Sequence, residues 1–217
     1  MSIVAISSTI GGLGDEIGLE LARTLSYDFA DREIIAKAAE RFGEGVMELR
    51  HVTEGKPSLW ERFSDAKQRY LAYVEAIILE LAARDNVILG GRGAIILLSR
   101  MRNVLRVRIT APEGVRAERV ENEHGLTHEA AIEAVWESDR ERGARVKFLY
   151  HVDWSDPVLY DMVLNTERLT VGRGATLIRN ALADERFQTT PETRRAITEL
   201  SATAQSTAAR LANPPPG

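Results

Sequence analysis

Short apolar runs alternate with longer amphipathic segments along most of the chain. The runs cover residues 3–7, 86–90, 105–110 and 161–164. Runs of this length, separated by helical patterns, are typical of parallel strands that are buried on both faces. The pattern therefore predicts an α/β fold, in which helices cover both faces of a parallel sheet.

The segments between the runs carry apolar residues three or four positions apart, which predicts amphipathic helices. Asp31 and Thr127 are expected to cap two of them, and Pro112 stands at a helix start, where proline is favoured. A long helix is expected over residues 58–83, and residues 58–61 at its start have the form of a capping box. A further helix is expected over about residues 171–183.

The pattern changes near residue 184. A break at residues 188–191 precedes a helix rich in alanine, threonine, serine and arginine. We therefore divide the chain into a domain over residues 1–183 and a C-terminal helical arm over residues 184–217. The thin apolar stripe of the arm favours packing within the chain, and a homodimer contact through this helix is the alternative. The stripe consists of Ile197, Leu200, Ala204, Ala208 and Leu211.

Composition narrows the functional classes. The length of 217 residues allows one substantial domain, and the formal net charge of −4 gives no reason to expect binding to nucleic acid or to a membrane. The absence of cysteine excludes disulfides and thiol catalysis, and the four histidines lack metal-ligand spacing. No transmembrane run and no secretory signal is recognisable, so a cytoplasmic protein is expected.

A glycine-rich turn follows the first apolar run and leads into an amphipathic helix. Its residues Gly11, Gly12 and Gly14 have the layout of a phosphate-binding loop, in which backbone N–H groups converge on an anion. In the frame G-x-x-x-x-G-K-[ST], however, Asp15 takes the lysine position and Glu16 the hydroxyl position. Both carboxylates repel an incoming triphosphate. A tight turn without a ligand is therefore the alternative interpretation.

Arginines form the second group of candidate functional residues. Arg92 stands among glycines at the end of the second apolar run, where ligands of open α/β sheets bind, and its planar guanidinium suits a phosphate. A later group predicts either a mobile lid over transferring phosphates or a solvated face of ion pairs with interleaved acidic residues. This group consists of Arg116, Arg119, Arg140, Arg142 and Arg145.

Taken in order, these segments resemble the cytidylate kinase-like family, a branch of the P-loop nucleoside monophosphate kinases. The resemblance covers about residues 3–183, and the set of segments in this order is specific for the fold. The segments that carry it are residues 6–18, 27–35, 88–92, 106–119, 139–142, 153–161 and 164–166.

The resemblance implies a three-layer P-loop NTP-hydrolase-like fold with a parallel sheet, a helical lid and a C-terminal helical extension. The implied reaction is transfer of the γ-phosphate of ATP to a nucleoside monophosphate, with CMP the first candidate and Mg²⁺ assisting. The implied site consists of Gly11, Gly12 and Gly14 at the ATP phosphates, Asp31 and Arg92 at the acceptor nucleotide, and Arg119, Arg142 and Arg145 as lid arginines on the transferring phosphoryl group.

Two positions depart from the family pattern. The family presents a basic residue where Asp15 stands, and cytidylate kinases carry an aspartate at the position of Gly93. Loss of one charge contact to a transition state lowers the rate by about 10²–10³. Two alternatives therefore stay open: a catalytically lapsed kinase fold that acts as a nucleotide-binding regulatory or protein-interaction module, and a small-molecule kinase with another acceptor.

Overall fold

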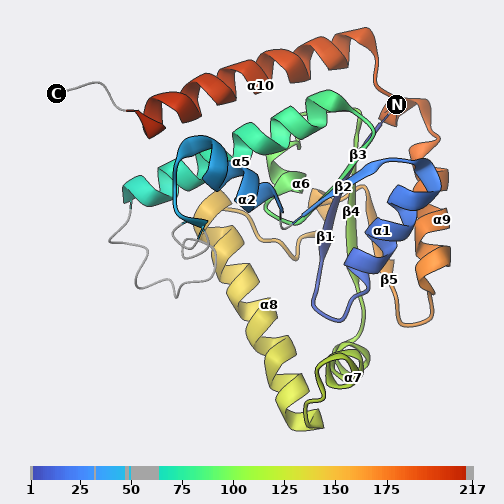
Figure 1. Cartoon of the computed structure of the whole chain (residues 1–217). Helices are drawn as coiled ribbons and strands as arrows, with labels where there is room; N and C mark the ends of the chain where they lie inside the picture. Colours follow the sequence, from blue (N-terminus) through green and yellow to red (C-terminus); the bar gives the residue numbers. More distant parts are fainter. Residues whose placement is uncertain (1, 32, 47–48, 50–63, 214–217) are drawn as a thin grey trace.

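The computed structural model describes residues 2–31, 33–46, 49 and 64–213 of the chain. Its centre is a five-stranded parallel sheet in the spatial order β2-β3-β1-β4-β5 (Figure 1). The predicted apolar runs correspond to β1, β3, β4 and β5. The strands are β1 (Ile3–Ser8), β2 (Asp28–Ala30), β3 (Val87–Gly90), β4 (Val104–Thr110) and β5 (Met162–Asn165).

Helices cover both faces of the sheet, as the apolar pattern predicts, so the fold is a three-layer α/β fold. On one face, α1 (Gly14–Leu25) and α9 (Val171–Leu182) form a core cluster with strand residues such as Val4 and Val107. On the other face, α2 (Glu33–Phe42), α5 (Ser64–Arg84) and α6 (Ala94–Leu97) form the larger cluster.

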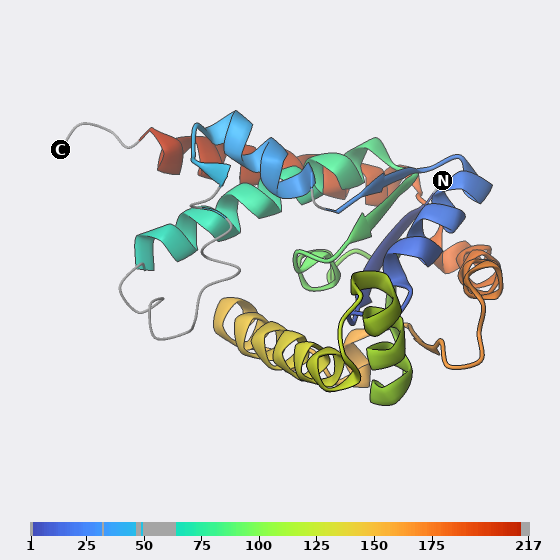
Figure 2. The same ribbon diagram turned by 60° about the horizontal axis from the view of Figure 1, so that its bottom comes forward.

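A helical pair extends beyond the carboxyl ends of the strands. It consists of α7 (Glu113–His124) and α8 (His128–Tyr150), which lie side by side in Figures 1 and 2. The Thr127 hydroxyl accepts a hydrogen bond from the Ala130 amide, which confirms the predicted cap of α8. Pro112 stands one residue before α7, at its N-cap. The pair has the position expected for the predicted lid.

Strand β2 was missing from the prediction. It has only three residues, and exposed Asp28 interrupts any apolar run, so the sequence pattern carries no strand signal there. The strand forms because it pairs with β3 and because the Phe29 ring packs on α1. A Cβ atom on Gly18 of α1 would lie 2.6 Å from this ring, so α1 needs a glycine at this contact.

Two predicted helix starts lie near undescribed residues. Asp31 precedes α2, and its carbonyl accepts a hydrogen bond from the Ile34 amide (3.1 Å). The predicted start of the long helix at residues 58–61 lies outside the described residues, and α5 is described from Ser64 onward. Among the described helices, none is both long enough and apolar enough to cross a membrane.

The C-terminal helix α10 (Pro191–Ala212) packs along α5, and its Ile197 and Ala208 belong to the larger core cluster (Figure 1). The prediction that Leu200 faces the same side was wrong, because its side chain is 43% exposed. At roughly 100° per residue, Leu200 lies about 60° from Ile197, at the edge of the stripe, and buried Ser201 lies nearer its centre. A homodimer contact through the outer face of α10 stays a prediction.

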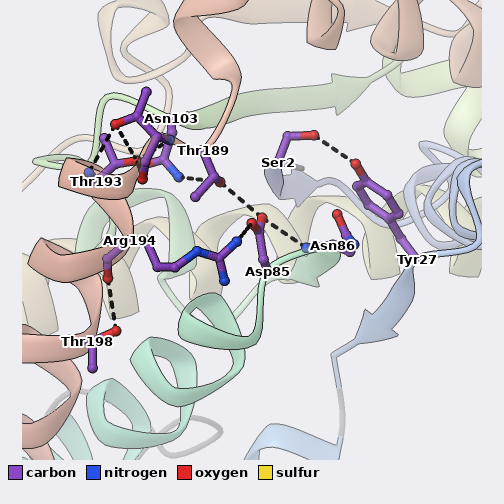
Figure 3. A network of polar contacts seen from close by, with 10 residues as sticks. Ser2, Tyr27, Asp85, Asn86, Asn103, Thr189, Thr193, Arg194 and Thr198 are labelled. Atoms are coloured by element: carbon purple, nitrogen blue, oxygen red, sulfur yellow. Dashed lines mark hydrogen bonds and ion pairs between the residues drawn. The ribbon is translucent and has the colours of Figure 1, made fainter.

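A polar network fastens the segment before α10 to the sheet (Figure 3). Buried Asp85, in the turn between α5 and β3, accepts hydrogen bonds from the Thr189 hydroxyl and from Arg194 Nη2, both at 3.0 Å. Asn103, just before β4, donates its side-chain amide to the same Thr189 hydroxyl (3.0 Å). The network lies at the amino-terminal ends of β3 and β4, whereas α7 and α8 lie beyond the carboxyl ends of the strands.

Candidate active site

A cavity of about 520 Å³ lies at the carboxyl ends of β1 and β3. The loop after β1, the glycine turn after β3, and α8 contribute to its wall. Ligands of open α/β sheets bind at this edge. Every site residue predicted from the sequence lines this cavity: Gly11, Gly12, Gly14, Asp31, Arg92, Arg119, Arg142 and Arg145. The structure thus brings these residues together, and their individual roles stay predictions.

The loop after β1 places the first backbone amides of α1 at the cavity. Leu13 caps α1 in the left-handed conformation (φ 64°), and the first hydrogen bond of the helix runs from the Ile17 amide to the Leu13 carbonyl (3.0 Å). The amides of Gly14, Asp15 and Glu16 therefore have no acceptor within the helix. Such a helix start attracts anions.

The glycines of this loop are required by its own packing. A Cβ atom on Gly12 would lie 2.8 Å from the Thr9 carbonyl oxygen, and one on Gly14 would lie 2.1 Å from the Ser8 Cβ atom. Gly11 has φ +67° and its Cβ atom would meet the backbone of α7. The open amides are therefore a better indicator of anion binding than the glycines themselves.

Arg119 of α7 binds the loop directly. Its Nη1 atom donates to the Gly11 carbonyl (2.9 Å) and to the Thr166 hydroxyl (3.0 Å), and its Nη2 atom donates to the Thr166 carbonyl (2.7 Å). Thr166 in turn donates to the Gly12 carbonyl (3.0 Å). Arg119 thus joins the loop to the segment after β5, and its predicted action on a phosphoryl group stays a prediction.

Arg92 and Asp31 lie next to each other at the end of β3. The Arg92 Nε atom is 3.9 Å from Asp31 Oδ1, and it has no hydrogen-bond partner among the described residues. Arg92 has φ 51° between two glycines that also have positive φ, so this turn points the side chain into the cavity wall. The pair offers a cation and an acceptor within one subsite.

Tyr150, the last residue of α8, explains why a glycine follows Arg92. A Cβ atom on Gly93 would lie 2.3 Å from the Tyr150 hydroxyl oxygen, and Gly93 has φ +77°. The Tyr150 hydroxyl donates to the Arg92 carbonyl at 3.2 Å. In this chain the tyrosine therefore takes the space that a side chain at position 93 would need.

Arg142 and Arg145, three residues apart on α8, both line the cavity. Burial lowers the pKa of Arg142, and the neighbouring Arg145 charge adds to this effect, while Asp139 and Asp31 oppose it. A guanidinium remains charged at neutral pH even so. Buried like charges that repel each other favour the binding of an anion between them.

The other arginines of this group form ion pairs. Arg116 is 6% exposed and holds Asp139 of α8 by two hydrogen bonds of 3.1 and 2.7 Å. Arg140 is exposed and lies 3.7 Å from Glu137 on the same helix. The ion-pair interpretation of the arginine group thus holds for Arg116 and Arg140, and the action of the others on transferring phosphates stays a prediction.

Aromatic side chains in the cavity wall were not among the predicted site residues. Burial raises the pKa of Tyr70 to about 12 and that of Tyr150 well above its usual value, so both phenols stay protonated. Tyr70 lies on the apolar side of α5, and its spacing in the sequence predicts a core residue rather than a site residue. Trp154 and Tyr160 lie in the irregular segment between α8 and β5, whose spacing carries no chemical signal.

A parallel sheet of this strand order, a glycine-rich loop between β1 and α1, and an arginine-bearing helical pair define a P-loop kinase fold. The family model of the cytidylate kinase-like family matches residues 3–168. The chain belongs to the cytidylate kinase-like family.

Curated relatives agree with this assignment. The cytidylate kinase of Methanopyrus kandleri is 29% identical over 195 residues, which are 84% of this chain and 95% of that protein. The cytidylate kinase of Methanocaldococcus jannaschii is 25% identical over 181 residues, or 80% of this chain and 96% of that protein.

Solved structures share the fold at lower identity. An uncharacterized protein from Eubacterium ventriosum has a TM-score of 0.65 and 18% identity, and the match covers 85% of this chain and all of that one. Shikimate kinase from Bacteroides thetaiotaomicron has a TM-score of 0.52 and 16% identity, and the match covers 83% and 98% of the two chains.

Proposed function

We propose that this protein transfers the γ-phosphate of ATP to a nucleoside monophosphate, with CMP as the first candidate acceptor. The observation that carries this proposal is the convergence of Arg92, Arg142 and Arg145 on the cavity that also receives the start of α1. The two anionic substrates of a phosphoryl transfer need such a combination of guanidinium groups and helix-start amides. The cytidylate kinase relatives support CMP as the acceptor.

The donor nucleotide would lie on the loop after β1. The amides of Gly14, Asp15 and Glu16 have no acceptor within α1 and would bind the phosphates, and Mg²⁺ bound with the nucleotide would neutralise phosphate charge. The residues present fit this ion, because Asp15 and Glu16 offer carboxylate oxygens at the cavity and magnesium is held by one or two carboxylates together with substrate phosphates. These carboxylates also make the donor site dependent on the cation, since alone they repel ATP.

The acceptor would lie near Asp31 and Arg92, and the transferring group between the acceptor and α1. Arg142 and Arg145 would stabilise the charge that spreads over the phosphoryl oxygens in the transition state. Catalysis of this kind consists of positioning and charge stabilisation and needs little covalent chemistry from the protein.

The test is CMP-dependent formation of ADP from ATP and Mg²⁺, measured in a coupled assay with CMP, UMP, AMP and GMP as acceptors. We expect Arg142→Ala to lower kcat by about 10²–10³, because one charge contact to the transition state is lost. Arg140→Ala is the matched control: it removes an exposed arginine of the same helix that does not line the cavity, and kcat should stay unchanged. Absence of turnover with every acceptor would overturn the proposal and favour a lapsed kinase fold.

A further inference from the structure

Trp154 contacts two arginines that come from different elements. The guanidinium carbon of Arg108, on β4, lies over the indole at 4.2 Å from the ring centroid, and that of Arg142, on α8, lies at 5.6 Å. Both distances are within the range in which an aromatic face attracts a cation. Trp154 itself is 8% exposed and lines the cavity. One indole therefore connects the sheet with the lid helix.

The sheet holds Trp154 through its backbone. The Tyr160 hydroxyl donates to the Trp154 carbonyl at 2.6 Å, and Arg108 Nη1 donates to the same carbonyl. Arg108 also donates to the Tyr160 hydroxyl at 3.3 Å. The Arg108 guanidinium, the Tyr160 hydroxyl and the Trp154 carbonyl therefore form one hydrogen-bonded group that holds the Trp154 backbone to β4. Arg108 also lies over the indole and so fixes the ring relative to the sheet.

The lid helix approaches the indole at Gly143, next to Arg142. A Cβ atom on Gly143 would lie 3.1 Å from Trp154 Nε1, so the indole packs against the backbone of α8. Glycine is unfavourable in the interior of a helix, and α8 extends from His128 to Tyr150. The close approach of the indole accounts for a glycine at this position.

Arg116 and Arg142 illustrate two ways to hold an arginine. Arg116 is held by the Asp139 carboxylate, which neutralises its charge. Arg142 lies against an aromatic ring, which attracts the guanidinium without adding a negative charge. Arg142 is thus held in place while its charge remains available to an anion in the cavity.

We propose that Trp154 is the positioning residue of the lid: it fixes α8 to β4 and presents the Arg142 guanidinium to the phosphoryl group that is transferred. This inference rests on the proposed function, since Arg142 acts there on the transferring group. Trp154 acts through Arg142 and takes no part in the chemical step.

The first test compares Trp154→Leu with Trp154→Phe in steady-state kinetics. We expect Trp154→Leu to lower kcat roughly tenfold and to leave the KM for ATP nearly unchanged, because only the support of Arg142 is lost. Trp154→Phe keeps an aromatic face and should recover most of kcat. Trp136→Leu is the control, since Trp136 lies on α8, the helix that carries Arg142, but is 60% exposed and outside the cavity. Equal kcat in the Leu variant and the wild type would overturn the positioning role.

The second test keeps Trp154 and needs no turnover. In a Trp60→Phe/Trp136→Phe background Trp154 is the remaining tryptophan, and we expect its fluorescence to change when CMP is titrated in, because the ligand alters the contact between Arg142 and the indole. Arg142→Ala should abolish this change, and Arg140→Ala should preserve it. No response, or a response that Arg142→Ala leaves intact, would overturn the positioning role. A normal response without any turnover would refute the proposed kinase activity alone.

Discussion

Asp15 and Glu16 give the cavity an uneven distribution of charge. Their carboxylates lie in the first turn of α1, whereas the arginines of the cavity come from α7, α8 and the turn after β3. A phosphate at the loop after β1 therefore meets open amides together with negative side chains, and a phosphate near α8 meets guanidinium groups. Binding of the donor is expected to depend more strongly on Mg²⁺ than binding of the acceptor.

We predict that Asp15→Lys tightens the binding of ATP without Mg²⁺ at least about tenfold, because it replaces a repulsive charge by a charge-assisted hydrogen bond. Calorimetric titration with ATP, with and without Mg²⁺, measures the change in Kd. Glu20→Lys is the matched control, since it makes the same charge change on α1 at a position outside the cavity. An unchanged Kd in Asp15→Lys, or an equal gain in both variants, would show that the charge at position 15 does not limit binding.

For single residues, the sequence predicts which of them lie near one another, but not which contacts each side chain makes. Loops after parallel strands share one edge of the sheet, so Gly14 and Arg92 could be placed together from topology alone. The contacts of Arg119 with Gly11 and Thr166 depend on segments far apart in the sequence, and no local pattern reports them. Trp154 was missed for the same reason.

The α7–α8 pair, which carries Arg119, Arg142 and Arg145 of the cavity, has a small core of its own. Ala117 and Val120 of α7 pack on Ala131 and Val135 of α8, apart from the two large clusters around the sheet. At the other end of α8, Lys67 of α5 donates to the Phe148 carbonyl (2.7 Å). The start of α8 thus depends on α7, and its end depends on the domain.

We predict that Asp139→Asn loosens the α7–α8 pair, because Arg116 is then left buried without a carboxylate. The half-exposed position of Asp139 limits the loss to about 2–3 kcal/mol. Hydrogen–deuterium exchange should become faster in α7 and the first half of α8 and stay unchanged in β1 and β4. Glu137→Gln, which removes an exposed partner of Arg140, should leave exchange unaltered. Unchanged protection of α7 in Asp139→Asn would contradict this account.

Elements with a strong local signal were predicted best. The buried strands and the cap at Thr127 follow from apolar runs and from the chemistry of a hydroxyl at a helix start. Strand β2 could not be predicted, because its place depends on pairing with β3 rather than on its own three residues. The exposure of Leu200 depends on how α10 is rotated against α5, which the stripe alone does not define.

On the scale of the whole molecule, the candidate site and the contacts of the C-terminal segment lie at opposite ends of the strands. The cavity lies at the carboxyl ends of the strands, and the Asp85 network fastens the C-terminal segment where β3 and β4 begin. Ile197 and Ala208 of α10 lie in the same core cluster as α5, so the segment after residue 183 contributes to the stability of the domain. We therefore expect that substitutions can alter the stability of the domain without altering ligand binding at the cavity.

We predict that Asp85→Asn lowers the free energy of unfolding by about 1.5–3 kcal/mol, because a buried charge-assisted network is lost. Asparagine tolerates the φ of 66° at this position, so the backbone is preserved. Urea unfolding measures the loss, and the CMP affinity should be unchanged. Asp184→Asn, which removes an exposed ion pair with Arg186 near α10, is the control and should have little effect. An altered CMP affinity in Asp85→Asn would contradict this account, because it would show that the Asp85 network influences the cavity at the other end of the strands.

The contact between Tyr150 and Gly93 restricts how this protein can diverge. The tyrosine hydroxyl occupies the space above position 93, so a side chain introduced there collides with Tyr150 unless a smaller residue stands at position 150, and it also has to tolerate the φ of +77°. Two positions 57 residues apart in sequence (93 and 150) are therefore expected to change together among homologues. Lineages that enlarged position 93 first would pass through a poorly packed intermediate, so the order of these substitutions is constrained as well as their identity.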